Sequence, residues 1–405
     1  MPTTPSVTRA DVEAARELLH DVVQPTPMQV SRWLSAVVGG PAHLKCENLQ
    51  RAGSFKIRGA YVRIARLPAD VRARGVVAAS AGNHAQGVAL AASLLDTKST
   101  VFMPQGAPIV KEHATRTYGA DVRFTGHTVD EALVAAREFA ERTGAELIHP
   151  FDHPDVVAGQ GTVGLEILEQ VPDVRTIAVS AGGGGLLAGI AVAVRSVRPD
   201  VRVVGVQAEG AAAYVRSLAA GEPTALPSMA TMADGIAVGR PGDLPFEVVQ
   251  AACEVRTVSE DSLSRALLMI MERAKLVVEP AGAAGVAAIC DEPAAFAPPV
   301  VAVLSGGNVD PLLLLKVIRH GLAAAGRYLR LRVRIPDRPG ALARLLAELA
   351  ETEANVLDVV HERTGSRLHV DEVEVALQVE TRGGEHAERV VGRLRAAGYP
   401  VTIEP

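Results

Sequence analysis

Short runs of β-branched residues alternate along most of this chain with longer segments rich in alanine, leucine and arginine. The runs are typical of strands and lie at residues 75–79, 99–103, 176–180, 201–206 and 300–304. Amphipathic segments between them, such as 129–142 and 186–197, are typical of helices. Strands and helices that alternate in this way predict an α/β fold, in which parallel sheets are covered by helices on both faces.

Three clusters of serine, glycine and asparagine directly follow predicted strands. Ser80 begins the segment Ser-Ala-Gly-Asn-His, Gly182 begins a run of four glycines, and Ser305 begins Ser-Gly-Gly-Asn. The carboxyl ends of parallel strands meet at one edge of a sheet, and α/β proteins bind their ligands there. We therefore expect the three clusters to contribute to one site.

A fourth cluster surrounds Lys56, which stands in Ser-Phe-Lys-Ile-Arg-Gly with apolar neighbours on both sides. A lysine in a partly desolvated pocket loses its preference for the ammonium form and becomes a nucleophile toward an aldehyde. Most lysines are solvated surface charges, so Lys56 carries weight only together with the other clusters. The set predicts a covalently held aldehyde cofactor, and pyridoxal phosphate is the cellular aldehyde that uses this chemistry.

The glycine run lies between a strand and a helix and predicts a phosphate site, because its backbone amides can converge on an anion at the helix N-terminus. Two other interpretations remain open. The pattern Gly183-x-Gly185-x-x-Ala188 matches a dinucleotide-binding motif, with Glu209 at the end of the next strand as a ribose contact. The run is also compatible with a plain structural turn.

The two serine clusters offer polar groups to a ring and to a small acid. A hydroxyl at Ser305 can meet a heteroaromatic nitrogen, and a neutral partner leaves a pyridine ring a milder electron sink than an aspartate would. Such a ring favours prompt loss of a β-substituent. Ser80, Asn83 and His84 offer donors to a carboxylate and a phenolic oxygen. Alternatively, the two serines cap helices and His84 is an ordinary histidine with satisfied hydrogen bonds.

The last part of the chain has a different pattern. Leu329, Leu331, Val333 and Ile335 alternate with arginines, which predicts a half-exposed strand. A turn at 337–340, helices at 341–352 and 385–397, and strands at 355–361, 373–379 and 400–403 complete the order βαββαβ of a small α+β domain. We predict a first domain at 1–321 with a smaller subdomain at about 50–150, a Gly/Ala linker at 322–328, and a second domain at 329–405.

Composition excludes several classes of protein. The 405 residues include 46 acidic and 41 basic side chains, a net charge of −5, without a basic run that would suit nucleic acid. Cys46, Cys253 and Cys290 form no CxxC pair, so we expect a reduced, cytoplasmic protein without disulfides or a thiolate metal site. Residues 1–7 do not resemble a signal peptide, and no apolar run reaches the ~18 residues of a membrane span. The apolar run at 312–315 is expected to lie in a core helix.

The four clusters, in this order and with this spacing, resemble the fold-type II pyridoxal-phosphate enzymes, and most closely the threonine and serine dehydratase branch. The resemblance extends over about residues 8–320 and implies two open parallel-sheet subdomains. It includes four further motifs: Pro-Thr-Pro at 25–27, Lys-Cys-Glu-Asn-Leu-Gln at 45–50, Gly-Gln-Gly-Thr at 159–162 and Val-Glu-Pro-Ala-Gly-Ala at 278–283. The final domain, with Asp-Arg-Pro-Gly-Ala-Leu at 337–342, resembles an ACT domain, a module that binds amino acids and regulates enzymes.

The resemblance assigns a role to each cluster. It implies that Lys56 binds pyridoxal phosphate covalently, that Phe55 packs against the cofactor ring and that Ser305 bonds to the pyridine nitrogen. Asn83 would bind the phenolic oxygen, and Ser80, Asn83 and His84 would face the substrate carboxylate. The phosphate would be bound by Gly182, Gly183, Gly184, Gly185 and Leu186.

Two positions depart from related racemases. Ala81 stands where serine racemases carry a serine that acts as acid and base on the opposite face, so racemisation is disfavoured. Glu209 and the carbonyl of Ala213 match part of a racemase metal site, but Val215 replaces its carboxylate. We therefore expect no bound divalent metal ion.

The expected reaction is the conversion of L-threonine to 2-oxobutanoate and ammonia, with L-serine giving pyruvate. The alternatives are a serine racemase or serine dehydratase, a β-replacement synthase, a catalytically silent amino-acid sensor and a dinucleotide-dependent oxidoreductase. The expected partners are the amino-acid substrate, an effector such as isoleucine, valine or a nucleotide, and further copies of the chain in a dimer or tetramer. The sequence leaves open whether the reaction serves isoleucine synthesis or threonine breakdown.

Overall fold

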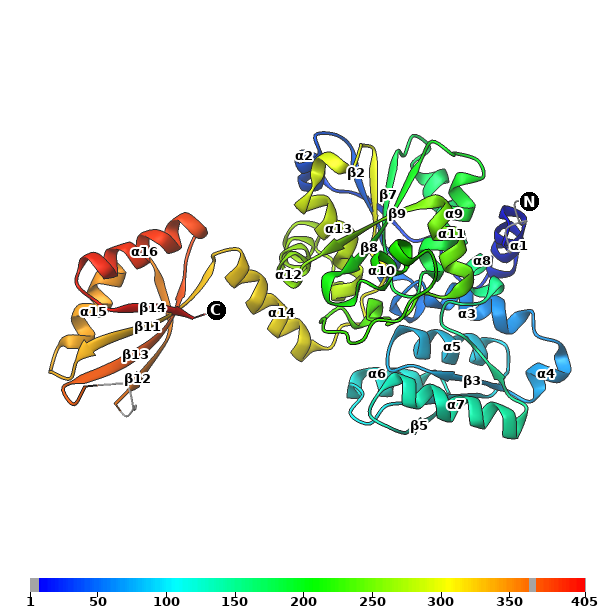
Figure 1. The fold of residues 1–405 in the computed structure, drawn as a ribbon, viewed down its shortest axis with the longest axis horizontal. Coiled ribbons are helices and arrows are strands. Elements are labelled where there is room, and N and C mark those ends of the chain that lie inside the picture. The colour runs from blue at the N-terminus through cyan, green and yellow to red at the C-terminus, as the bar shows by residue number, and fades with distance from the viewer. Residues whose placement is uncertain (1–6, 364–368, 405) are drawn as a thin grey trace. The chain divides into compact units, whose positions relative to one another are not determined.

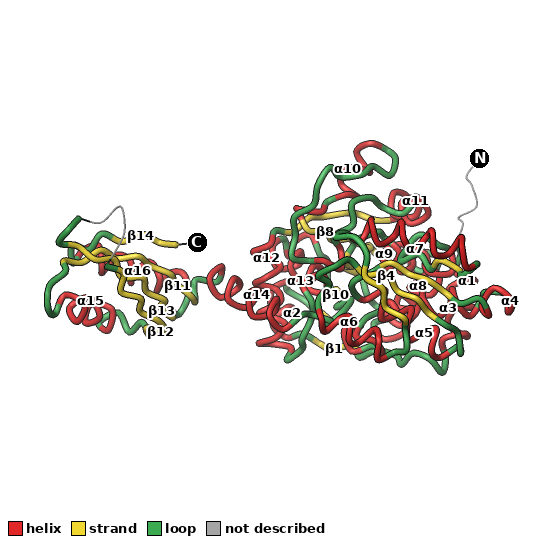
Figure 2. Tube along the Cα trace, turned by 90° about the horizontal axis from the view of Figure 1, so that it is seen from below, coloured by secondary structure: helices red, strands yellow, loops and turns green. Residues whose placement is uncertain are grey.

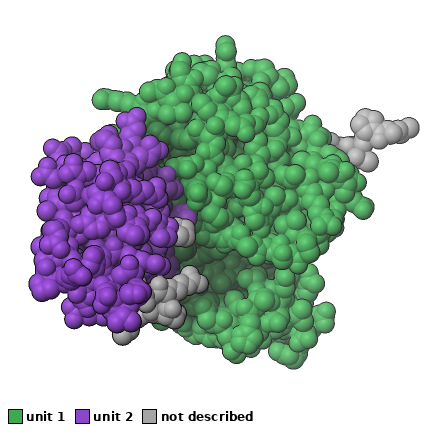
Figure 3. Space-filling model, turned by 60° about the vertical axis from the view of Figure 1, so that its left-hand side comes forward, with its two compact units in different colours: residues 1–314 green, residues 315–405 purple. Residues whose placement is uncertain are grey.

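The computed structural model describes residues 7–363 and 369–404. Residues 1–6, where no signal peptide is predicted, lie outside the described residues, as do 364–368 and 405 of the predicted second domain. The chain forms two compact units, Met1–Leu314 and Leu315–Pro405, which are coloured separately in Figure 3. Each unit has its own hydrophobic core.

The first unit is built on a six-stranded sheet with the order β1-β2-β10-β7-β8-β9. All neighbouring strands are parallel except β1, which runs antiparallel to β2. The central strands are buried along their whole length, as expected for a parallel sheet covered on both faces. The strands are β1 (Met28–Val30), β2 (Ala42–Lys45), β7 (Thr176–Ser180), β8 (Arg202–Ala208), β9 (Cys253–Val258) and β10 (Val300–Val303).

A second sheet in the same unit has four parallel strands in the order β5-β4-β3-β6. Its strands all come from the segment predicted as a smaller subdomain: β3 (Val76–Ala79), β4 (Ser99–Met103), β5 (Asp121–Phe124) and β6 (Glu146–Leu147). The predicted α/β class with open parallel sheets is confirmed. The edge strands β1, β5, β6 and β9 were not predicted, and neither was β2, which lies between β1 and β10.

Helices lie on both sides of these strands (Figures 1 and 2). The helices of the first unit are α1 (Arg9–Leu19), α2 (Arg32–Val38), α3 (Lys56–Ala65), α4 (Ala69–Ala73), α5 (Asn83–Leu94), α6 (Ile109–Thr117), α7 (Val129–Thr143), α8 (Pro154–Gln170), α9 (Gly185–Arg195), α10 (Ala213–Ala220), α11 (Asp243–Ala252), α12 (Glu260–Met269) and α13 (Pro280–Asp291). Local sequence sets their ends, as α7 illustrates. Thr128 and Glu131 form a capping box at its start, and Gly144 ends it with a φ of 73°.

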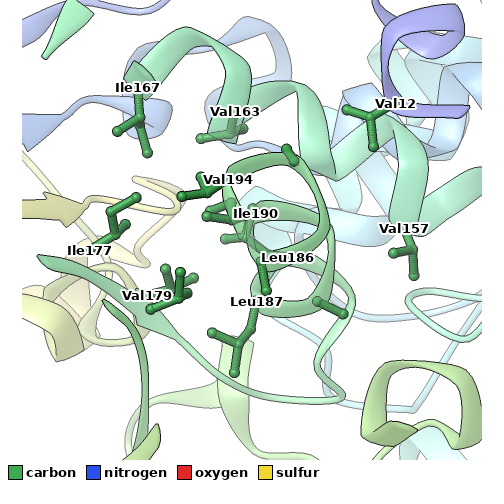
Figure 4. Packing of buried hydrophobic residues seen from close by; sticks show 14 of the residues in the cluster. Val12, Val157, Val163, Ile167, Ile177, Val179, Leu186, Leu187, Ile190 and Val194 are labelled. Carbon is green, nitrogen blue, oxygen red and sulfur yellow. The ribbon is translucent and has the colours of Figure 1, made fainter. Parts of the chain in front are cut away.

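The core places the start of α9 at the carboxyl end of β7. A Cβ atom on Gly189 of α9 would lie 2.4 Å from the Val157 carbonyl oxygen of α8, so these two helices can cross only because glycine stands at the contact. Apolar side chains of both helices pack against Ile177 and Val179 of β7 (Figure 4). On the opposite face α13 lies against the same strand, where a Cβ on Gly285 would be 3.1 Å from the Ala178 carbonyl oxygen.

The second unit is an antiparallel sheet with the order β12-β13-β11-β14, covered on its apolar face by two helices. The alternating leucines and valines of β11 point into this core, and the arginines between them do not. The predicted βαββαβ order is confirmed: β11 (Tyr328–Pro336), α15 (Ala341–Ala350), β12 (Asn355–Glu362), β13 (Glu372–Glu380), α16 (Gly384–Ala396) and β14 (Val401–Glu404).

The structure departs from the predictions for residues 312–328 in two respects. The segment predicted as a linker at 322–328 is helical as far as Ala324, because α14 (Pro311–Ala324) continues through most of the Gly/Ala segment, and β11 begins at Tyr328. Alanine is the strongest helix former, so a Gly-Leu-Ala-Ala-Ala-Gly segment can extend a helix. The run at 312–315 is helical but not a core helix, since Leu312 is 70% and Leu315 46% exposed. Across the described part of the chain, no helix combines the length and apolar character of a membrane span.

Candidate active site

The clusters that follow β3, β7 and β10 line one cavity of about 740 Å³. Every residue predicted to contact a cofactor or substrate lies on its wall: Phe55, Lys56, Ser80, Asn83, His84, Gly182, Gly183, Gly184, Gly185, Leu186 and Ser305. The carboxyl ends of strands from both sheets therefore meet at a single cavity. The structure brings the predicted residues together, and their individual roles toward a ligand remain predictions.

The backbone around Lys56 is bent to present this lysine at the first turn of α3. Ala52 and Gly53 both adopt left-handed conformations, with φ values of 59° and 69°. The Phe55 N–H then donates to the Ser305 carbonyl oxygen at 3.2 Å. Because of this bond, Lys56 begins its helix directly beside the Ser305 loop.

The amine of Lys56 is held in the interior and weakly paired. Its Nζ donates to the Pro150 carbonyl oxygen at 2.9 Å and lies 5.1 Å from the centroid of the Phe55 ring. Burial lowers the pKa of Lys56 to about 8, although the Glu279 carboxylate opposes this shift. A larger share of the amine is therefore uncharged near neutral pH than for an ordinary lysine, as attack on an aldehyde requires.

The glycine loop presents a row of free backbone donors. None of the N–H groups from Gly182 to Leu186 has a hydrogen-bond acceptor among the described residues, and no side chain caps the start of α9. Gly184 has a φ of 97°, and a Cβ on Gly183 would lie 2.3 Å from the Phe151 ring. Buried N–H groups are rarely left unpaired, so this arrangement fits a bound anion such as a phosphate group.

At the start of α5, directly after the loop that follows β3, His84 is bonded as the alternative interpretation of an ordinary histidine with satisfied hydrogen bonds expects. The Nε2 atom of His84 bonds to the Ile148 carbonyl oxygen at 2.8 Å. Burial, with Lys56 nearby, lowers the pKa of His84 to about 3, so the ring is neutral and its single N–H is used in this bond. The imidazole thus has no donor left for a carboxylate. The backbone amides at the start of α5 and the side chains of Ser80 and Asn83 remain available to bind a carboxylate.

Ser305 lies at the floor of the cavity, where it is 2% exposed. Its hydroxyl makes no hydrogen bond within the described ranges, although its backbone oxygen accepts from Phe55. A buried hydroxyl that faces a cavity without a protein partner is free to bond to a ligand. The helix-cap interpretation does not apply in this structure, because α14 begins only at Pro311.

Sequence reasoning missed three charged residues on the cavity wall. Lys111 of α6 pairs with Asp234 at 2.5 Å, which joins the segment of the four-stranded sheet to that of the six-stranded sheet. Glu279 is 3% exposed, and its Oε1 accepts from Asn83 Nδ2 at 2.6 Å. Burial, with Asp234 nearby, raises the pKa of Glu279 to about 7. Only the motif at 278–283 pointed to Glu279, and no pattern singled out Lys111 or Asp234.

A second missed feature is a buried ion cluster behind Lys56. Arg58, which is fully buried, donates to both carboxylate oxygens of Glu47 at 2.8 and 2.9 Å and to Glu166 at 2.6 Å. Lys45 pairs with Glu166 at 2.5 Å. The four charges balance, and they connect α3, which carries Lys56, to β2 and α8.

Among the described residues, no group of three or more His, Cys, Asp or Glu side chains is arranged to hold a metal ion. Val215, which stands at the position of the racemase carboxylate, is 45% exposed on α10.

Comparisons with known proteins identify both parts of the chain. Residues 19–306 match the family model described as "Pyridoxal-phosphate dependent enzyme", and residues 329–398 match the ACT domain model. An L-threonine ammonia-lyase of Thermotoga maritima is 46% identical over 398 residues, which covers 98% of this chain and 99% of the relative.

Solved structures resemble the first unit. The processed form of threonine deaminase isoform 2 from Solanum lycopersicum is 36% identical with a TM-score of 0.74, over 77% of this chain and 91% of that chain. Maize serine racemase is 35% identical with a TM-score of 0.74, over 78% of this chain and 98% of that chain.

Proposed function

This chain belongs to the pyridoxal-phosphate-dependent enzymes and carries a C-terminal ACT domain, and from this membership we propose that it dehydrates and deaminates L-threonine to 2-oxobutanoate and ammonia. L-Serine would give pyruvate by the same reaction. The observation that carries the proposal is one cavity that is lined both by the buried amine of Lys56 and by the free amides of the glycine loop. The relative of the same length, named an L-threonine ammonia-lyase, supports the choice of substrate.

The residues present fit pyridoxal phosphate. Lys56 would hold the aldehyde, the amides of Gly182 to Leu186 would hold the phosphate, and the unpaired hydroxyl of Ser305 would bond to the ring nitrogen. When bound, the cofactor supplies an electron sink for the electron pair left at the substrate α-carbon. Because serine carries no charge, its partner nitrogen is not held protonated as it would be by a carboxylate.

The protein's own groups orient the substrate and move its proton. Backbone amides at the start of α5 and the Ser80 hydroxyl would hold the substrate carboxylate. The free amine of Lys56 would be the base that removes the proton from the substrate α-carbon. The β-hydroxyl then departs as water, and one water returns when the released enamine hydrolyses, so the net products are the keto acid and ammonia.

A keto-acid assay and active-site labelling test this proposal. Purified protein should form 2-oxobutanoate from L-threonine, and borohydride reduction followed by peptide mapping should place a pyridoxyl group on Lys56. The Lys56→Ala variant should lose ~10³-fold or more of turnover, because both the anchor and the base are removed. Labelling at another lysine, or turnover that survives in this variant, would contradict the assignment.

Serine racemisation is the second candidate, because maize serine racemase has a similar fold. A racemase needs an acid on the face of the substrate opposite the lysine, and Ala81 on the cavity wall has no proton to give. Chiral analysis of serine after incubation separates the two activities. D-Serine formed faster than pyruvate would favour the racemase.

The second unit is proposed to bind an amino-acid effector, as the ACT family match indicates. We also propose that the enzyme forms homo-oligomers in the cytoplasm. Sedimentation of the full chain with and without isoleucine or valine would test both proposals.

A further inference from the structure

Glu279 occupies the N-cap position of α13 without capping it. A carboxylate at this position normally accepts hydrogen bonds from the first amides of the helix, yet the Glu279 side chain makes no such bond. It turns instead toward the cavity, where its Oε1 accepts from Asn83 Nδ2 at 2.6 Å. Within the described residues this is the one hydrogen bond that the Glu279 side chain makes. The buried carboxyl of Glu279 is therefore bonded to the Asn83 amide instead of to the start of its own helix. This arrangement points to a role in holding that amide.

The other end of the Asn83 amide is held by Asn308. Asn308 Nδ2 donates to Asn83 Oδ1 at 2.9 Å and to the Ala52 carbonyl oxygen at 2.7 Å. Both hydrogens of Asn308 Nδ2 are therefore used, and neither acceptor could be bonded if this amide were flipped. The orientation of Asn308 is set by the backbone, and Asn308 in turn sets the orientation of Asn83.

The two contacts together allow only one orientation of Asn83. Its oxygen faces a donor and its nitrogen faces an acceptor, so a flipped Asn83 would place two acceptors together at Glu279 and two donors together at Asn308. The Nδ2 atom carries two hydrogens, and Glu279 takes only one of them. The second N–H remains for a ligand in the cavity that Asn83 lines.

We propose that Glu279 and Asn308 are positioning residues that clamp Asn83 so that it offers a donor, rather than an acceptor, to the phenolic oxygen of the cofactor. This inference rests on the proposed function. An N–H at this point stabilises the deprotonated phenolic oxygen, whereas a carbonyl oxygen would repel it. Glu279 can perform this role whether or not it is protonated, because a hydrogen on Oε2 leaves Oε1 free to accept.

Two substitutions at residue 279 test the clamp. Glu279→Met keeps a similar volume but removes the acceptor, so holoprotein should bind pyridoxal phosphate ~10- to 100-fold more weakly and show a changed visible absorbance band. Glu279→Gln keeps an acceptor oxygen without the charge and should restore both readouts toward those of the unaltered protein. The measurements are cofactor fluorescence titration and absorbance spectra of full-length protein.

Two further variants separate the clamp from charge and folding effects. Asp234→Asn removes a carboxylate from the same cavity without touching Asn83, so the absorbance band should keep its position. Asn308→Ala removes the clamp from the other side and should show the spectral change that is expected for Glu279→Met. It therefore tests the clamp even if Glu279→Met does not fold. Unaltered cofactor affinity and spectrum in both Glu279→Met and Asn308→Ala would overturn the inference. Failure of the unaltered protein to bind pyridoxal phosphate would instead overturn the proposed function.

Discussion

At the scale of single residues, the site depends on side chains whose protonation is set by burial. Lys56 and His84 lie in the same cavity wall, and burial lowers the pKa of both. For Lys56 the result is a nucleophile, whereas for His84 it is a neutral ring tied to a backbone carbonyl. Each side chain bonds to one backbone carbonyl, but the neutral amine of Lys56 keeps a lone pair that can attack an aldehyde, whereas the only N–H of His84 is taken.

The pKa of Lys56 predicts how fast cofactor-free protein captures pyridoxal phosphate. The neutral amine is the reactive form, so the second-order rate should rise with pH and level off above about 8, the lowered pKa of Lys56. An ordinary lysine would show this rise near its usual pKa of about 10.4. Stopped-flow absorbance measures the rate. Because Glu279 raises the pKa of Lys56, the midpoint should move lower in Glu279→Gln, and a midpoint near 10 in the unaltered protein would contradict the prediction.

Ser305 predicts the fate of the substrate after proton removal. In Ser305→Asp the carboxylate should hold a proton on the cofactor nitrogen, deepen the electron sink and raise transamination or racemisation relative to keto-acid release. Ser305→Ala is the matched control, since it removes the hydroxyl without adding charge. Product partition by chromatography and the visible spectrum are the readouts. If both stay unchanged in Ser305→Asp, the side chain does not contact the ring nitrogen.

At the scale of elements, helix starts and helix crossings shape the cavity. The glycine loop and α9 offer free amides, and the neighbouring Phe151 ring leaves no room for a side chain on Gly183. Gly183→Ala should therefore displace the loop and weaken cofactor binding by ~10-fold or more, since overpacking of this kind costs ~1–3 kcal/mol. Gly392→Ala on α16 is the control, because nothing lies within 4 Å of its added methyl group. Equal cofactor affinity in both variants would show that the loop tolerates a side chain.

The ion cluster that holds α3 predicts a large effect on stability. Arg58→Met leaves Glu47 and Glu166 buried without their main partner, which should lower the free energy of unfolding by about 3–5 kcal/mol. Arg9→Met, which breaks an exposed pair with Glu13, should cost at most about 1 kcal/mol. Urea denaturation of the cofactor-free proteins measures both. Similar losses in the two variants would mean that the buried cluster contributes no more than a surface pair.

At the scale of the whole molecule, two units with separate cores predict separable functions. A chain that ends after Ala325, just beyond α14, should still bind cofactor and dehydrate L-threonine, because every cavity residue lies before position 306. It should lose any response to isoleucine or valine, since an effector acts only through a site it contacts. In the full chain the effector should change apparent substrate affinity ~5- to 150-fold. A shortened chain that keeps the full response would place the effector site in the first unit.

Much of this architecture could be predicted from the sequence alone, because it follows from local patterns. Buried parallel strands are continuous β-branched runs, helices carry an apolar stripe, and glycine and serine clusters mark the strand ends where ligands bind. These signals predicted the α/β sheets, the βαββαβ unit and the segments that line the cavity. Edge strands such as β5 and β9 were missed because their side chains are partly exposed, and the last residues of α14 were assigned to the linker because Gly/Ala segments suit both states.

Only the tertiary structure decided how individual side chains are partnered. Glu279, Lys111 and Asp234 come from segments far apart in the chain, and no local pattern indicates that they meet around the cavity. Asn308 stands in a cluster that was expected at the site, but only the fold shows that it bonds to Asn83. For His84 the sequence left two interpretations open, and only the fold shows that its N–H bonds to a backbone carbonyl that follows β6. Residue type limits what a side chain can donate or accept, whereas the fold determines which partner it has and whether its charge survives burial.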